Sequence, residues 1–114
     1  MPFQNLNQIR AKNAAAANIG TGTEGGGSIA KKVPVMIREN GFIAAMLFAK
    51  ETGAGYRDVF IAIIEHLHSI NRHHNLPINF EEFLLEICEK DSAVLRDITS
   101  EAMAYLTYLR RFQE

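Results

Sequence analysis

Four histidines that are close in the sequence are the first residues to consider for chemistry, because histidine is a common metal ligand. His66 and His68 are two residues apart, so they point to different faces of a helix. Glu65 and His68 form one Glu-x-x-His pair, but a di-iron site needs two such pairs and two further glutamates. With one cysteine in the chain, a zinc site would rest on histidine and carboxylate ligands alone. We therefore predict no metal site and no cofactor, and we expect solvated surface positions for His66, His68, His73 and His74.

Groups for nucleophilic catalysis lack the partners that would activate them. No Gly-x-Ser-x-Gly motif is present, and Cys88, beside Ile87, is expected to be a small buried hydrophobic side chain. The arginines and histidines that a ribonuclease would use do not share one helical face. The serines occupy cap-like or mid-helix positions without a nearby histidine and carboxylate: Ser28, Ser69, Ser92 and Ser100. We predict that the protein is not an enzyme, with a small ribonuclease as the catalytic alternative.

The net charge is unevenly distributed along the chain, although its total is only −1. Residues 1–50 carry six basic and two acidic groups, a net charge of +4, and residues 51–114 carry a net charge of −5. Lys31 and Arg38 are seven residues apart, so a helix would place them on one face, with Lys32 adjacent. Such a face can contact phosphates, although basic residues near helix C-termini also compensate the helix dipole. Salt bridges between the two halves would explain the charge asymmetry equally well.

Helices must position these residues, because the sequence has strong helical periodicity and almost no strand signals. Ser28 is expected to cap a helix that stops at Gly41. Pro34 lies late enough in this helix to cause a kink or a later start near Val33. The expected helices cover residues 3–19, 28–40, 42–52 and 56–73, followed by a fifth helix capped by Asn79 and a sixth opened by Asp91.

Apolar side chains at spacings of three and four residues predict which faces of these helices point inward. The longest stripe lies on the last helix, which is expected to be the central element of the bundle. The predicted inward positions are Tyr56, Val59, Phe60, Ile63, Leu67 and Ile70; Phe80, Phe83, Leu84 and Ile87; and Val94, Ile98, Ala102, Tyr105, Leu109 and Phe112. The sequence therefore predicts an all-α fold, a single compact bundle of about six helices.

The length of 114 residues fits a single helical domain over residues 1–114. Residues 20–27 hold five glycines and are expected to form a flexible, solvent-exposed loop. No apolar run approaches the ~20 residues that span a bilayer, so we expect no membrane segment. The polar N-terminus and the lone cysteine favour a cytoplasmic location.

Two segments carry a family resemblance. The first, residues 32–50, reads Lys-Val-Pro-Val-Met-Ile-Arg-Glu-Asn-Gly-Phe and continues to Lys50. The second, in the last helix, comprises Asp91, Ser92, Arg96, Thr99, Glu101, Ala102 and the run from Ala104 to Phe112. Together with residues 10–14, they resemble the small helical subunit of the type III-B CRISPR effector, the Cmr complex. The chain departs from that family at Tyr108, where tryptophan is usual, and in its glycine-rich loop.

The resemblance implies a non-catalytic scaffold role in antiviral defence. Copies of such a subunit stack beside the backbone subunits that hold the guide RNA, forming an inner filament along the guide–target RNA duplex. The expected partners are therefore the other subunits of the effector complex, the guide RNA and target RNA, and neighbouring copies of the chain itself. Cleavage of the target would belong to the neighbouring subunits.

The matched motifs also imply which residues make contacts. RNA-backbone or subunit contacts are expected first from Lys32, Arg38, Arg96 and Arg110, and then from Lys31, Lys50 and Arg10. Asn40, Gly41, Thr99 and Phe112 match as structural positions. The closest alternative is the small subunit of the related type III-A complex. A stand-alone helical adaptor is a further alternative, and it would bind a protein partner through the acidic face formed by Glu81, Glu82, Glu86 and Glu89.

Overall fold

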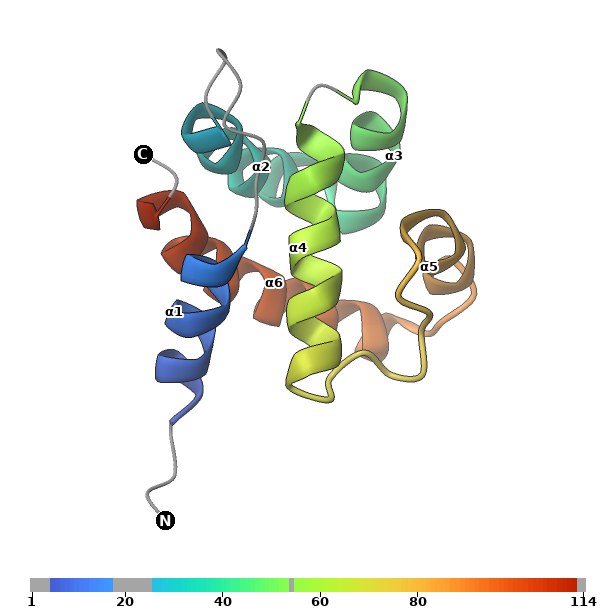
Figure 1. The fold of residues 1–114 in the computed structure, drawn as a ribbon. Helices are drawn as coiled ribbons and strands as arrows, with labels where there is room; N and C mark the ends of the chain where they lie inside the picture. Colours follow the sequence, from blue (N-terminus) through green and yellow to red (C-terminus); the bar gives the residue numbers. More distant parts are fainter. Residues whose placement is uncertain (1–4, 18–25, 54, 113–114) are drawn as a thin grey trace.

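The computed structural model of the protein describes residues 5–17, 26–53 and 55–112, and this part of the chain forms helices and no strands (Figure 1). The helices are α1 (Leu6–Ala16), α2 (Gly26–Asn40), α3 (Phe42–Thr52), α4 (Tyr56–Ser69), α5 (Phe80–Ile87) and α6 (Ser92–Phe112). The predicted all-α bundle is confirmed. No helix in these ranges is both long enough and apolar enough to cross a membrane.

Helix ends are set by caps that the local sequence encodes. The Asn5 side chain accepts a hydrogen bond from the Gln8 backbone N–H, and the Gln8 side chain accepts one from the Asn5 N–H, which forms a capping box on α1. Asn79 accepts the N–H groups of the second and third residues of α5, as predicted. Asp91 accepts the N–H of Val94 and so opens α6. These short polar side chains satisfy N–H groups that have no partner inside the helix.

The start of α2 differs from the prediction. The helix begins at Gly26, two residues before the expected cap at Ser28, and it continues through Pro34 instead of starting near Val33. Gly26 and Gly27 therefore belong to the helix. The remainder of the predicted loop, residues 20–25, lies outside the described residues, as do the ends of the predicted first helix at residues 3–4 and 18–19.

The end of α4 is also earlier than predicted, at Ser69 instead of about residue 73. In the segment that follows Ser69, the residues Asn71, His74 and Asn75 have positive φ angles, which a right-handed helix does not allow. Asparagine tolerates this left-handed region better than most residues, so the asparagines here favour a turn over another helical turn. The bounds of α3, by contrast, match the prediction, with Gly41 and Gly53 at positive φ on either side.

The core lies where α6 crosses α4, with α1 and α5 on opposite sides of α4 (Figure 1). Most predicted inward positions are buried, including Phe60, Leu67, Ile98 and Leu109. Phe112 is an exception: it is the last residue of α6 and is 53% exposed. Tyr56, Ile70 and Val94 are half-buried. The separate expectation that Cys88 is buried is wrong, because α5 ends at Ile87 and the following residue turns to solvent.

Candidate functional site

Two of the predicted contact residues, Arg38 and Arg110, meet on the surface where α2 lies against α6. Arg38 lies in the last turn of α2 and Arg110 in the last turn of α6, and both side chains are exposed. They line a shallow hollow of about 140 Å³ together with Pro34, Met103, Leu106 and Thr107. We call this feature the α2–α6 hollow. It places two guanidinium groups from distant parts of the chain around one small space.

Of the other predicted cations, Lys31 and Lys32 lie on α2, one of the two helices that form the hollow, and Lys50 and Arg96 lie elsewhere. Lys31 and Lys32 are exposed on α2, and Lys31 lies on the same helical face as Pro34 and Arg38. Lys50 is exposed in the last turn of α3. Arg96 is exposed near the start of α6, where its Nη1 donates to Ser92 Oγ at 3.4 Å. Lys50 and Arg96 do not line the hollow, so the structure brings together only part of the predicted set.

Arg10 has a different setting, because its guanidinium contacts a buried carboxylate. Its Nε and Nη2 donate to the two carboxylate oxygens of Glu101 at 2.8 and 2.7 Å, and its Nη1 donates to Asn7 Oδ1. Glu101 is 2% exposed. This two-point ion pair fixes α1 to α6, and together with the bond to Asn7 it leaves no guanidinium nitrogen of Arg10 without a partner within the chain.

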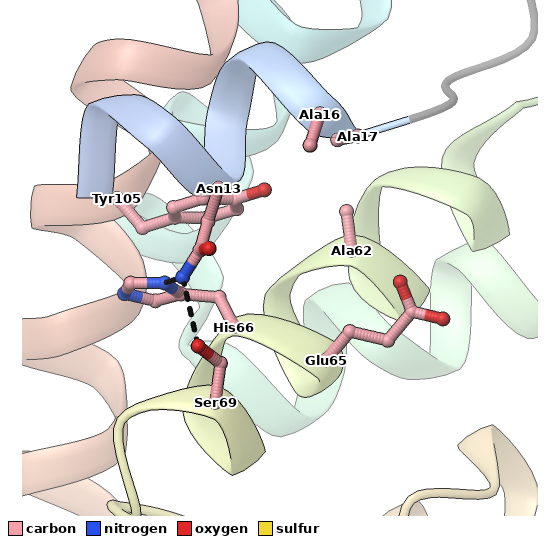
Figure 2. A pocket seen from close by; sticks show the side chains of 8 residues that line it. All are labelled: Asn13, Ala16, Ala17, Ala62, Glu65, His66, Ser69 and Tyr105. Atoms are coloured by element: carbon pink, nitrogen blue, oxygen red, sulfur yellow. Dashed lines mark hydrogen bonds between the residues drawn. The ribbon is translucent and has the colours of Figure 1, made fainter. Parts of the chain in front are cut away.

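His66 connects this ion pair to α4. His66 is 2% exposed, its ring stacks on Tyr105 with centroids 4.3 Å apart, and its Nε2 is 2.9 Å from Glu101 Oε2. On its other side, Nδ1 is 2.9 Å from the amide nitrogen of Asn13, which also donates to Ser69 Oγ (Figure 2). We call Arg10, Asn13, His66, Ser69 and Glu101 the polar cluster. It joins α1, α4 and α6 through hydrogen bonds that run from the buried Glu101 and His66 to the exposed Ser69.

The charges in the polar cluster follow from burial and pairing. The hydrogen bond to Glu101 raises the pKa of Arg10. Burial alone would raise the pKa of Glu101, but the hydrogen bonds from Arg10 and His66 outweigh it and lower that pKa. Burial lowers the pKa of His66, although the bond to Glu101 opposes this. His66 is therefore neutral at pH 7, and because an ionised carboxylate only accepts, Nε2 carries the proton and Nδ1 accepts from Asn13.

The remaining histidines form two smaller groups at the end of α4. His74 Nε2 lies 2.7 Å from Asp97 Oδ2, and Arg72 also contacts this carboxylate at 3.4 Å. His68 and His73 stack with ring centroids 3.9 Å apart. Among the described residues, no group of three or more histidine, cysteine or acidic side chains is arranged to hold a metal ion.

Comparison with known protein families decides the assignment. A family model described as CRISPR-associated protein (Cas_Cmr5) matches residues 6–114, which is nearly the whole chain. The chain belongs to the Cas_Cmr5 family. No curated protein and no solved structure gives a significant match. Membership identifies a CRISPR-associated Cmr subunit and implies assembly with the other subunits of such a complex.

The structure of this Cas_Cmr5 chain corrects the sequence-based view of its histidines. His66 is buried and not on the solvated surface, because α4 lies in the middle of the bundle and packs against both α1 and α6. Glu101 was recognised only as part of a motif, yet it is the centre of the polar cluster. The sequence held a signal for it: Glu101 falls between Ile98 and Tyr105 on the apolar stripe of α6, and a charge at such a position needs a buried partner.

Proposed function

We propose that this Cas_Cmr5 chain is the non-catalytic small subunit of a type III-B CRISPR complex and acts in antiviral defence in the cytoplasm. Copies of it would line the guide–target RNA duplex as an inner filament, beside the subunits that hold the guide RNA. The family match supports the assignment of the chain to a Cmr complex. The observation that supports an RNA-facing role is the α2–α6 hollow, with its two arginines.

The α2–α6 hollow has the chemistry of a phosphate contact. Guanidinium groups bind phosphate oxygens through paired, charge-assisted hydrogen bonds, and two of them around one hollow can hold a single phosphate from both sides. The nearby Thr107 hydroxyl donates to the Met103 carbonyl at 3.2 Å, so Arg38 and Arg110 are left to supply the donors. Contacts of this kind bind the phosphate backbone of RNA and carry no sequence information. This suits a subunit whose complex reads its target by base pairing.

The polar cluster supports the non-catalytic part of the proposal. Ser69, His66 and Glu101 would resemble a Ser-His-acid triad, but the Asn13 amide lies between the serine and the histidine. An amide cannot carry a proton from hydroxyl to imidazole, so Ser69 is not activated as a nucleophile. We expect the isolated protein to leave labelled RNA at full length in the presence of Mg²⁺. Cleavage that co-purifies with the protein and is lost in a His66→Gln variant would contradict this.

Charge reversal around the hollow tests the RNA-facing surface. In reconstituted complexes, an Arg38→Glu, Arg110→Glu variant is expected to bind a guide-complementary RNA roughly tenfold more weakly near 0.15 M salt, from the loss of about two phosphate contacts. Both residues are exposed, so the variant should fold normally, with less than ~0.5 kcal/mol lost per substitution.

A matched control reverses two exposed charges on α5, a helix that contributes no residue to the α2–α6 hollow. Glu82 and Glu86 are exposed on α5, and Glu82→Lys with Glu86→Lys should leave capture of the RNA nearly unchanged. If this variant loses RNA while the arginine variant binds normally, the assignment of the RNA-facing surface to α2 and α6 is wrong.

A further inference from the structure

A second hollow, of about 240 Å³, opens between α1 and α4, with Tyr105 of α6 behind it (Figure 2). The hollow exists because three of its lining residues are alanines, whose side chains are too short to fill it. Figure 2 shows the Tyr105 hydroxyl directed toward the side of the pocket on which these alanines lie. The complete lining is Asn13, Ala16, Ala17, Ala62, Glu65, His66, Ser69 and Tyr105. We call this feature the α1–α4 pocket, and no step of the proposed function uses it.

The polar groups of the α1–α4 pocket have acceptor capacity that the described part of the chain does not use. The Asn13 amide nitrogen donates hydrogen bonds to His66 and Ser69. Its carbonyl oxygen accepts no hydrogen bond from a described residue. Tyr105 is 1% exposed as a residue, and its hydroxyl, which has no hydrogen-bond partner among the described residues, opens into the pocket. Neither oxygen is among the buried atoms that lack a partner, so both can be reached from the pocket, where a guest that supplies donors could bind them.

The charge of the pocket lining is negative. Glu65 is exposed at the rim and forms no ion pair with any described residue. His66 is neutral, since its Nε2–H donates to Glu101 and its Nδ1 accepts from Asn13. Tyr105 is also neutral, because burial and then the charge of Glu65 raise the pKa of its hydroxyl. The lining therefore offers an amide carbonyl and two hydroxyls, with one carboxylate at the rim and no positive group.

We propose that the α1–α4 pocket binds the ammonium end of an alkylamine, either a free polyamine or the tip of a lysine side chain from a partner subunit. An ammonium group has three N–H donors and no acceptor, which complements the Asn13 carbonyl and the Tyr105 hydroxyl oxygen, while the Glu65 carboxylate at the rim attracts its charge. The methylene chain next to the ammonium would pack on the apolar surface of Ala16, Ala17 and Ala62. An anion would meet the Glu65 charge, and a divalent metal would find a single carboxylate.

Titration with n-butylammonium chloride, followed by NMR shifts of the Ala62 and Ser69 signals, tests this proposal. We expect saturable shifts that neither n-butanol nor sodium chloride at the same ionic strength produces. Glu65→Gln should weaken binding about tenfold, because the charged acceptor is lost. Tyr105→Phe should weaken it about threefold while keeping the stack on His66, because one neutral hydrogen bond is lost.

Two variants outside the pocket serve as controls. Glu86→Gln removes an exposed carboxylate from α5, and Tyr108→Phe removes a hydroxyl from α6, so both should bind the probe as the wild type does. Equal shifts with n-butanol, no saturation, or wild-type binding by Glu65→Gln would overturn the proposal. Spermidine and Nα-acetyl-lysine methylamide then distinguish the sources: tighter binding of spermidine points to a free polyamine, and equal or tighter binding of the lysine derivative points to a partner side chain.

Discussion

Replacing Glu101 with alanine is expected to lower the free energy of unfolding by about 3 kcal/mol, the low end of the cost of breaking a buried ion pair. Glu101 is 2% exposed and accepts two hydrogen bonds from Arg10 and one from His66. The variant leaves both donors without their acceptor, and the Arg10 side chain is only 16% exposed, so water replaces little of the loss. Thermal unfolding should show a fall in Tm of roughly 10 °C or more for a chain of this size.

Two further variants separate the charge of Glu101 from its shape. Glu101→Gln keeps the side-chain volume and one carbonyl acceptor, so its cost should lie between those of the wild type and Glu101→Ala. Glu86→Ala removes an exposed glutamate from α5 and should cost less than ~0.5 kcal/mol. Equal losses for Glu101→Ala and Glu86→Ala would show that the polar cluster contributes nothing to stability.

The polar cluster also makes the stability of the wild type depend on pH. The pKa of His66 is lowered in the folded state, so below about pH 6.5, the ordinary histidine pKa, the unfolded chain binds more protons and stability falls. The pKa of Glu101 is lowered as well, so its contribution is lost when the pH falls below its usual value of 4.5. His66→Gln should reduce the loss of stability below about pH 6.5, and His73, whose pKa is also lowered, contributes to the same loss.

Local features of the fold were readable from the sequence because they depend on near neighbours in the chain. Asn79 and Asp91 cap helices through backbone N–H groups two or three residues away, and those caps were predicted. Gly41 and Gly53 bound α3 because glycine adopts positive φ without a steric cost. The start of α2 was missed because three glycines in a row lower helix propensity, yet the helix extends through Gly26 and Gly27.

The polar cluster was not predicted because its members are far apart in the chain. Arg10 is 91 residues from Glu101, and His66 is 35 residues from it. Periodicity identifies the face of a helix on which a residue lies, but not which helix packs there. The closeness of Arg38 and Arg110 in the α2–α6 hollow was missed for the same reason. Each was predicted as a contact residue, but only the packing of α2 on α6 brings them together.

Helix α6 links the polar cluster to the proposed RNA surface. Glu101 holds α6 to α1 and α4 from the buried side, while Arg110, nine residues further along, faces solvent opposite Arg38. The position of Arg110 relative to Arg38 therefore depends on how α6 is seated. A loss of the buried contacts of α6 would disturb the spacing of the two guanidinium groups without touching either arginine.

Replacing Phe60 with alanine is expected to cost about 4 kcal/mol of unfolding free energy, as large-to-small changes of a buried phenylalanine do. Phe60 is fully buried and contacts Phe42 and Phe80 edge to face, with ring centroids 5.5 and 6.4 Å away, so it connects α3, α4 and α5. Urea unfolding should show a lower midpoint with an unchanged slope, since the surface exposed on unfolding stays the same. Because Phe80 is the first residue of α5, the amides of α5 should also exchange faster with solvent.

The matched control for this prediction is Phe48→Ala. Phe48 also forms an edge-to-face pair, with Tyr56 at 5.2 Å, but its side chain is 44% exposed. Its removal opens no closed cavity, and the loss should be about 1 kcal/mol, in line with an aromatic pair at the surface. A loss for Phe60→Ala no larger than that for Phe48→Ala would mean that the three phenylalanines do not hold α5 to the bundle. In that case α5 would depend on Phe83, Leu84 and Ile87, the other side chains through which it is buried.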